Sequence, residues 1–196
     1  MGGHRMISYT KLVEIRWHGR GGQGAVTSAE LIAQAAINEG KYAQAFPSFG
    51  PERRGAPVLA FDRIDSAEPI RIRAGITQPD VVIVLDPGLL SIMDVSSGLK
   101  ETGVIIVNTK KSAKQIRSEF DIKGELATVN ATKIARELLG VPIVNTTMVG
   151  ALIKATELIK LESMDAPLGK RFGKLADRNF KAMKKAYEET LVEEQQ

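Results

Sequence analysis

Residues 12–39 read LVEIRWHGRGGQGAVTSAELIAQAAINE, and this stretch decides the fold. Residues 12–17 predict a β-strand, with His18 at its end. A glycine-rich turn follows over residues 19–24. Apolar residues then recur at helical spacing and predict a helix that ends near Glu39. The recurring residues are Ala25, Val26, Ala29, Ile32, Ala33, Ala36 and Ile37. A strand, a glycine turn and a helix in this order are typical of an α/β fold.

Two later runs indicate how the rest of the sheet is built. Residues 81–85 (VVIVL) and 104–107 (VIIV) are continuous and β-branched, which is typical of parallel strands covered on both faces. Residues 58–64 and 69–73 alternate apolar with polar residues and predict a hairpin at the sheet edge. Further strands are predicted over 42–46 and 126–130, and further helices over 88–98, 111–119, 131–139, 147–159 and 176–192.

These elements predict a single α/β domain over residues 12–196. Its doubly wound, mostly parallel sheet carries helices on both faces and an antiparallel edge hairpin. Residues 1–11 are predicted to be a flexible lead-in.

Composition excludes several classes of protein. Hydrophobic residues make up 43% and charged residues 26% of the 196 residues, which is the composition of a globular domain. No run approaches the length of a membrane-spanning helix, so no membrane partner is expected. The chain has no cysteine, so a cysteine nucleophile and thiolate ligation of an iron–sulfur cluster are excluded for this chain. The lack of disulfides favours a cytoplasmic location. No catalytic constellation and no set of metal ligands is predicted.

The positive charge of the chain is mild and local. The formal net charge is +4, and residues 170–185 hold many of the bases with Asp177 as their one acid. This pattern indicates a solvated helix rather than a nucleic-acid interface, because no aromatic residues are interleaved with the bases. No nucleic-acid partner is predicted.

The glycine turn has the chemistry of a phosphate site. Gly19, Gly21 and Gly24 satisfy the pattern GxGxxG between a strand and a helix. Glycine lets a ligand approach the backbone, and the helix N-terminus presents free N–H groups to an anion. Arg20 adds a positive charge and Gln23 adds an amide. The alternative is that these glycines only make a tight turn.

A stand-alone dinucleotide-binding oxidoreductase is the rival interpretation of the same pattern. Such a fold carries an Asp or Glu about 20 residues further on, at the end of the second strand. Gln44, Ala45 and Phe46 occupy that end here, which counts against a dehydrogenase.

The loop after the second predicted strand is more distinctive. Residues 47–55 read PSFGPERRG, and both this loop and the glycine turn follow the carboxyl end of a strand. The two loops are therefore expected to face one crevice. Arg53 and Arg54 are candidates to pair with phosphates or with carboxylates of a partner. The alternative is a pair of surface arginines in a stiff loop. Asp86, at the end of the VVIVL run, is predicted to cap a helix.

Four segments together resemble a known family. HGRGGQG (18–24), FPSFGPERRG (46–55), PDVVIVLD (79–86) and NTTMVGA (145–151) are similar to the gamma subunit of 2-oxoacid:ferredoxin oxidoreductases, the pyruvate synthase group. The resemblance extends over nearly the whole chain from about residue 12. Pyruvate-type gamma chains match best, although ketoisovalerate and 2-oxoglutarate relatives share the motifs.

The resemblance implies a role inside a larger enzyme. The complex would convert a 2-oxoacid and coenzyme A into acyl-CoA, carbon dioxide and reduced ferredoxin. Thiamine diphosphate and the iron–sulfur clusters would belong to partner alpha, beta and delta subunits, and this chain would not be active alone. The gamma unit is associated with coenzyme A handling, so the expected contacts to coenzyme A are Gly19, Arg20, Gly21, Gly22, Gln23, Gly24, Ser48, Arg53 and Arg54. A purely structural scaffold between catalytic chains is a further alternative.

Overall fold

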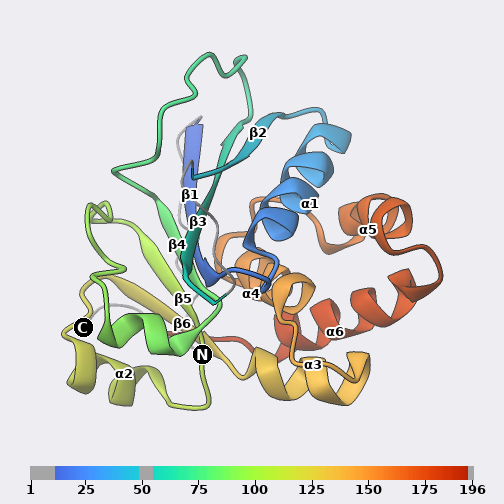
Figure 1. Cartoon of the computed structure of the whole chain (residues 1–196). Helices are drawn as coiled ribbons and strands as arrows, with labels where there is room; N and C mark the ends of the chain where they lie inside the picture. Colours follow the sequence, from blue (N-terminus) through green and yellow to red (C-terminus); the bar gives the residue numbers. More distant parts are fainter. Residues whose placement is uncertain (1–11, 49–54, 194–196) are drawn as a thin grey trace, which may run out of the picture.

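The computed structural model describes residues 12–48 and 55–193, and its strands form one seven-stranded sheet in the order β2-β3-β1-β4-β5-β6-β7 (Figure 1). β1, β4, β5 and β6 pair in parallel, whereas β2, β3 and β7 pair antiparallel at the two sides. The strands are β1 (Leu12–Arg20), β2 (Tyr42–Pro47), β3 (Pro57–Asp65), β4 (Val81–Val84), β5 (Val104–Asn108), β6 (Glu125–Val129) and β7 (Leu191–Glu193). The predicted α/β sheet with a parallel core and an antiparallel edge is confirmed.

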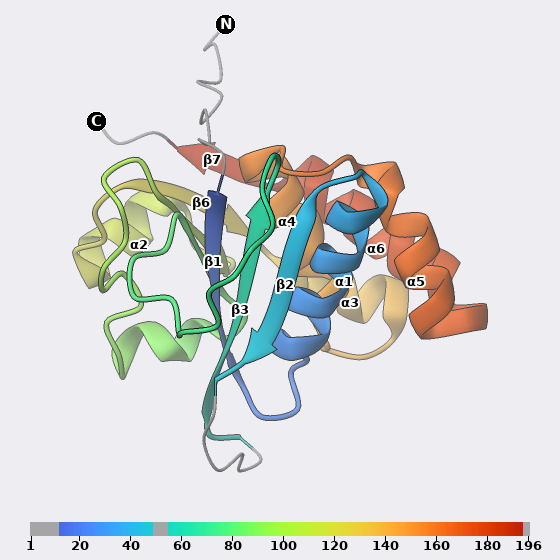
Figure 2. The same cartoon turned by 90° about the horizontal axis from the view of Figure 1, so that it is seen from above.

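Helices cover both faces of the sheet, as predicted. Figure 2 shows α2 on one side and α1, α3, α4, α5 and α6 on the other. We call these sides the α2 face and the α1 face. The helices are α1 (Ala25–Asn38), α2 (Ala113–Phe120), α3 (Ala131–Leu139), α4 (Asn145–Thr156), α5 (Asp165–Phe172) and α6 (Ala176–Glu189). Three short 3₁₀ helices are η1 (Pro87–Ser91), η2 (Leu161–Met164) and η3 (Gly173–Leu175). Among the described residues, no helix is long and apolar enough to cross a membrane.

The parallel strands are central because their side chains are apolar on both faces. Every residue of β4 and β5 is buried. Val81 and Ile83 pack with α1 and α4, whereas Val82 and Val84 pack with η1 and α2. Continuous apolar runs therefore mark the strands that lie between two layers, as the sequence predicted.

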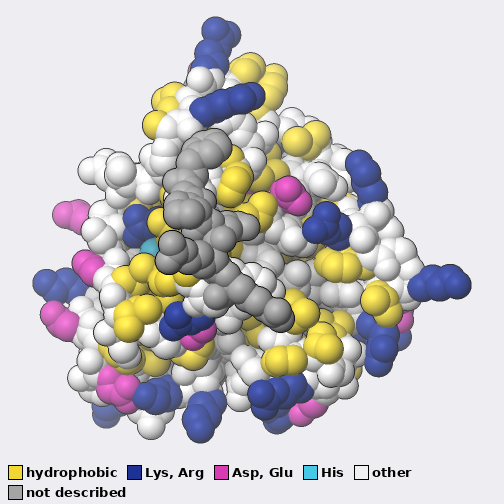
Figure 3. All heavy atoms as spheres, in the orientation of Figure 1, with side chains coloured by type: hydrophobic (Ala, Val, Ile, Leu, Met, Phe, Trp, Pro, Cys, Tyr) yellow, Lys and Arg dark blue, Asp and Glu magenta, His cyan; other side chains and the backbone are white. Residues whose placement is uncertain are grey.

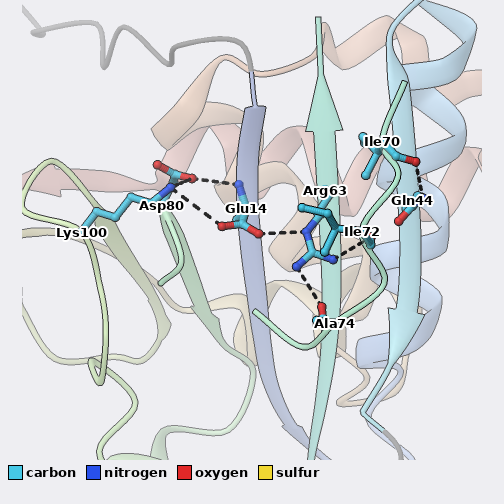
Figure 4. A network of polar contacts seen from close by, with 8 residues as sticks. All are labelled: Glu14, Gln44, Arg63, Ile70, Ile72, Ala74, Asp80 and Lys100. Carbon is cyan, nitrogen blue, oxygen red and sulfur yellow. Dashed lines mark hydrogen bonds and ion pairs between the residues drawn. The ribbon is translucent and has the colours of Figure 1, made fainter. Parts of the chain in front are cut away.

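A loop replaces helices over one part of the α2 face. Residues 66–80, which we call the covering loop, cross β1, β2 and β3 on that face (Figure 4). Arg63 on β3 donates to Ile72 O (3.1 Å), to Ala74 O (2.8 Å) and to the Glu14 carboxylate (2.8 Å). Gln44 on β2 donates to Ile70 O at 2.8 Å. Side chains of the sheet therefore hold alternate carbonyl groups of the covering loop.

The predicted hairpin between 58–64 and 69–73 is wrong in its second strand. β3 pairs with β2 and β1, so the antiparallel hairpin is β2–β3. Residues 69–73 are not a strand, because their carbonyl groups are held by the side chains of Gln44 and Arg63 instead of a neighbouring backbone.

Two predicted helices also differ from the structure. The helix predicted over 88–98 is only η1, followed by turns in which Asp94 accepts from Ser96 N and Gly98 has a φ of +72°. The helix predicted over 176–192 ends at Glu189, and Leu191 lies instead in β7, which pairs with β6. α5 was not predicted, because its short sequence holds a proline and a glycine. Residues 1–11 lie outside the described residues.

The parallel strands end together at one edge of the sheet, which we call the carboxyl edge. Their last residues are Arg20, Val84, Asn108 and Val129. The chain leaves β1 and β6 toward the α1 face, and leaves β4 and β5 toward the α2 face. The connections therefore change face twice, between β1 and β4 and between β5 and β6. In open α/β sheets such positions form crevices where ligands bind.

Candidate functional site

The glycine turn lies at the first of these two positions. β1 continues through Gly19 and Arg20, which pair with Val58 and Pro57 of β3, so the turn starts only at Gly21. Gln23 closes the turn: its N–H donates to Arg20 O (2.9 Å), and its side-chain oxygen accepts from Arg20 N (2.7 Å).

Gly24 is needed at the start of α1 for two reasons. Its φ is +82°, in the region that favours glycine. A Cβ built on it would also lie 2.8 Å from the side-chain nitrogen of Asn145, at the start of α4. The starts of α1 and α4 therefore meet at this residue. Asn145 was not among the predicted site residues, although the NTTMVGA segment begins with it.

The turn presents a set of unused N–H groups. In the described chain, the N–H groups of Gly22, of Gly24 and of residues 25–27 have no acceptor, whereas Ser28 N donates to Gly24 O. The cap of α1 makes no side-chain hydrogen bond, and its first turn holds no acidic residue. Free amides at a helix N-terminus stabilise an anion, so the turn has the geometry of a phosphate site.

Arg20 is already paired inside the protein. Its Nε donates to the Asp86 carboxylate at 2.7 Å, and its Nη1 donates to Gly55 O at 3.2 Å. Asp86 also caps η1, as predicted, by accepting from Gly88 N at 2.8 Å. The ion pair compensates most of the Arg20 charge. The turn therefore offers backbone amides to an anion rather than a free arginine.

The loop that follows β2, which we call the second loop, meets the glycine turn, as the sequence predicted. Gly21 N donates to Ala56 O (2.9 Å), and Gly55 N donates to Gly21 O (3.3 Å). At the other end of the loop, the exposed Ser48 donates its N–H to Leu59 O (2.9 Å). Arg53 and Arg54 lie outside the described residues. The residues that flank them place both ends of this loop at the carboxyl edge.

His18 is buried, and its imidazole is a weak base. It is 4% exposed, and Arg16 Nε donates to its Nε2 at 3.0 Å. The pKa of His18 is lowered from 6.5 to about 4, mainly by burial. The neighbouring Arg16 charge also lowers this pKa, by more than Asp94 raises it. His18 is therefore a neutral acceptor that positions Arg16.

The end of β2 lacks the acid of a dinucleotide site. β2 ends at Phe46 and Pro47, and the side-chain nitrogen of Gln44 is engaged by the covering loop. Phe46 instead contacts Phe61, with ring centroids 5.3 Å apart. Among the described residues, none at the end of β2 provides the carboxylate with which a dinucleotide-binding strand would hold a ribose.

The sequence matches one described protein family over most of its length. The pyruvate ferredoxin/flavodoxin oxidoreductase family matches residues 14–189. The chain is 55% identical over 185 residues to the pyruvate/ketoisovalerate oxidoreductases common subunit gamma of Thermococcus kodakarensis, covering 93% of this chain and 100% of that one. It is 52% identical over 178 residues to pyruvate synthase subunit PorC of Methanothermobacter marburgensis, covering 90% of this chain and 97% of that one.

A solved structure shares the fold. The crystal structure of pyruvate oxidoreductase subunit PORC from Thermotoga maritima superimposes with a TM-score of 0.83 at 39% sequence identity. The match covers 94% of this chain and 100% of that chain.

Proposed function

The chain belongs to the pyruvate ferredoxin/flavodoxin oxidoreductase family as a gamma subunit, and from this premise we propose that it supplies the coenzyme A crevice of its complex. As a gamma subunit it is part of a 2-oxoacid:ferredoxin oxidoreductase complex. Pyruvate is the proposed oxoacid, because the relatives above carry that substrate in their names. The proposed products are acetyl-CoA, carbon dioxide and reduced ferredoxin.

One observation carries the proposal: the second loop is joined to the glycine turn by main-chain hydrogen bonds. Gly21 bonds to both Gly55 and Ala56, beside the unused N–H groups of Gly22 and Gly24. The loop that carries Arg53 and Arg54 in the sequence therefore ends beside free amides. Amides and guanidinium groups at one place suit the phosphates of coenzyme A.

The proposed mechanism is one of positioning. Backbone amides fixed by Gln23 hold the phosphates, and the thiol is thereby oriented toward the reacting acyl group on a partner subunit. Orientation of this kind lowers a barrier by removing the entropy cost of bringing two reactants together. The chain itself moves no proton and forms no covalent bond in this proposal.

The redox chemistry is assigned to partner subunits. Thiamine diphosphate, which would activate the oxoacid, and the iron–sulfur clusters are proposed to lie in the alpha, beta and delta subunits. This chain has no cysteine with which to ligate a cluster, and its described residues hold no group of acids and histidines fit for a metal ion. Ferredoxin would accept electrons from the complex.

The test uses the reconstituted complex with single substitutions in the second loop. Arg53→Gln and Arg54→Gln are each measured for the KM of coenzyme A and the KM of pyruvate. Loss of one charge-assisted contact raises the KM for coenzyme A about tenfold, while the KM for pyruvate stays unchanged. Arg71→Gln, on the covering loop, is the matched control because it removes an exposed arginine distant in sequence from the glycine turn.

Two results would contradict the proposal. An unchanged KM for coenzyme A in both variants removes the phosphate role. Normal assembly of the complex together with unchanged kinetics would favour the structural scaffold instead.

A further inference from the structure

A second crevice opens where β5 and β6 end, at the second change of face along the carboxyl edge. Its volume is about 740 Å³, within the range of small-molecule sites. It lies between α2 and α3, and residues that directly follow β5 and β6 line it, among them Thr109, Asn130 and Thr132. No site was predicted here from the sequence, and the glycine turn is not part of the lining of this crevice.

Positive side chains surround this second crevice. Its basic lining residues are Lys110, Lys111, Lys133 and Arg136, and its one acid is Glu137. Lys and Arg side chains gather along the lower margin of the face drawn in Figure 3.

Acidic neighbours compensate only two of these four charges. Lys111 pairs with Glu119 at 2.5 Å, and Lys133 lies 3.8 Å from Glu137. Lys110 and Arg136 have no acidic partner within the described part of the chain. The crevice therefore keeps a positive charge that favours an anion.

Part of the crevice lining is apolar. Leu90 of η1 and Ile116 and Phe120 of α2 line it together with Pro87. Leu90 and Ile116 are buried, whereas Phe120 is half-buried at the end of its helix. A ligand that fills the crevice would place an apolar or aromatic part against these residues and its charge toward the lysines.

The floor of the crevice is rigid before any ligand arrives. Asn108, 4% exposed, donates from Nδ2 to Leu85 O (2.9 Å) and to Thr132 Oγ1 (2.9 Å). Its Oδ1 accepts from Thr132 N at 3.2 Å. The Asn130 side chain accepts from Lys133 N at 3.1 Å. These amides at the start of α3 are thus used within the protein, so the side-chain cations and not a helix end must hold an anion.

We propose that this second crevice binds a phosphorylated ligand with a flat apolar part, of the size of a mononucleotide. Four cations in the lining favour a phosphate group, and the apolar part of the lining favours a base or ring that a bare anion lacks. The site is separate from the glycine turn, since Asp86 binds Arg20 beside that turn, whereas Pro87 and Gly88 line the second crevice. The proposal does not depend on the coenzyme A role of that turn.

The test titrates ADP into the full chain, with amide chemical shifts and calorimetry as readouts. ADP is expected to shift the amides of Thr109, Lys110 and Thr132, and to bind more tightly than inorganic pyrophosphate. The double variant Lys133→Gln/Arg136→Gln is expected to weaken ADP binding about tenfold or more, because two charge-assisted contacts are lost. Arg71→Gln/Lys184→Gln removes the same charge from two other exposed positions and is expected to change nothing.

Three results would overturn the proposal. The first is the absence of shifts at these amides at millimolar ADP. The second is equal weakening in the two double variants, which would mean a net-charge effect only. The third is a set of shifts confined to Gly22 and residues 24–27, which would place ADP at the glycine turn. That third result would leave the proposed function intact, whereas failure of the Arg53 and Arg54 variants would leave this second crevice intact.

Discussion

His18 and Asp62 lie on opposite faces of the sheet, and each is buried with one polar atom that has no partner in the described chain. The unpaired atoms are His18 Nδ1 and Asp62 Oδ1. Arg16 donates to His18, and Trp17 Nε1 donates to the Asp62 carboxyl at 2.7 Å. Burial of an ionisable group disfavours its charged form, so each residue links the stability of the fold to pH.

His18 is expected to titrate with a midpoint near its pKa of about 4 instead of 6.5. The unfolded chain takes up a proton near pH 6.5, whereas the folded chain does so only near pH 4. His18 therefore contributes stability that is present above pH 6.5 and is lost as the pH falls toward 4. The loss amounts to about 3 kcal/mol of unfolding free energy.

NMR of the imidazole signals measures this midpoint directly. His18→Gln keeps an oxygen acceptor for Arg16, identifies the His18 signals by their disappearance, and is expected to lack this part of the acid destabilisation. A midpoint near 6.5 would contradict the buried, neutral ring.

Asp62 is expected to change the stability of the fold with pH in the direction opposite to His18. Burial raises its pKa well above the ordinary value of 3.8. The unfolded chain loses the proton near pH 3.8 while the folded chain keeps it, so stability falls as the pH rises from there to the folded-state pKa. Asp62→Asn cannot ionise and still offers Trp17 an oxygen.

Denaturation of the wild type and of Asp62→Asn across a pH series tests the raised pKa of Asp62. Within that window, the stability of wild type relative to Asp62→Asn is expected to fall by about 1.4 kcal/mol per pH unit. A difference that stays constant with pH would show that Asp62 ionises as easily as it does in water.

At the scale of elements, the contact between α4 and α6 depends on one glycine. A Cβ built on Gly150 would lie 2.0 Å from Met183 O, which is a backbone atom and cannot turn aside. The two helices therefore touch backbone to backbone, and any side chain at this position must push them apart. Gly150 lies in the NTTMVGA segment, so this segment also serves packing.

Gly150→Ala is expected to lower the unfolding free energy by about 3 kcal/mol, the upper range for overpacking a core. Gly169→Ala is the matched control, because a Cβ on this α5 glycine meets no atom within 4 Å. That control is expected to raise stability by up to about 1 kcal/mol through helix propensity. Chemical denaturation followed by circular dichroism compares the two, and equal effects would refute the close contact.

At the scale of the whole molecule, contacts between distant segments hold the covering loop on the sheet. Arg63 connects β3 to β1 through Glu14 and to the loop through Ile72 and Ala74, and it is 3% exposed (Figure 4). Asp80, at the end of the loop, accepts from Glu14 N at 2.9 Å and from Lys100 at 2.8 Å. The loop is therefore fixed at several points along its length.

Arg63→Met is expected to release the covering loop from the sheet. Trypsin cleavage after Arg71 and Arg73 is then expected to speed up about tenfold or more, since the loop opens more easily without charge-assisted hydrogen bonds. Arg117→Met is the matched control, because Arg117 holds two carbonyl groups of a different loop, Ile122 O and Gly124 O. Unchanged cleavage in Arg63→Met, or the same increase in both variants, would contradict the role of Arg63.

The sequence predicted those elements whose signal is local. The VVIVL and VIIV runs became buried strands, and the glycine turn leads into α1 as predicted, although its first two residues belong to β1. Periodicity fails where distant side chains decide the conformation. Residues 69–73 alternate like a strand, yet Gln44 and Arg63 bind their carbonyl groups, so no strand forms.

By itself, the sequence determined the α/β class, the glycine turn and the family, since each follows from residues that are neighbours along the chain. Only the tertiary structure decided that Arg20 is paired with Asp86, 66 residues away, and that four basic residues border a crevice beyond β5 and β6. The physical reason is that charge compensation and crevice shape depend on distances in space. Those distances are set by the strand order, which local sequence patterns do not encode.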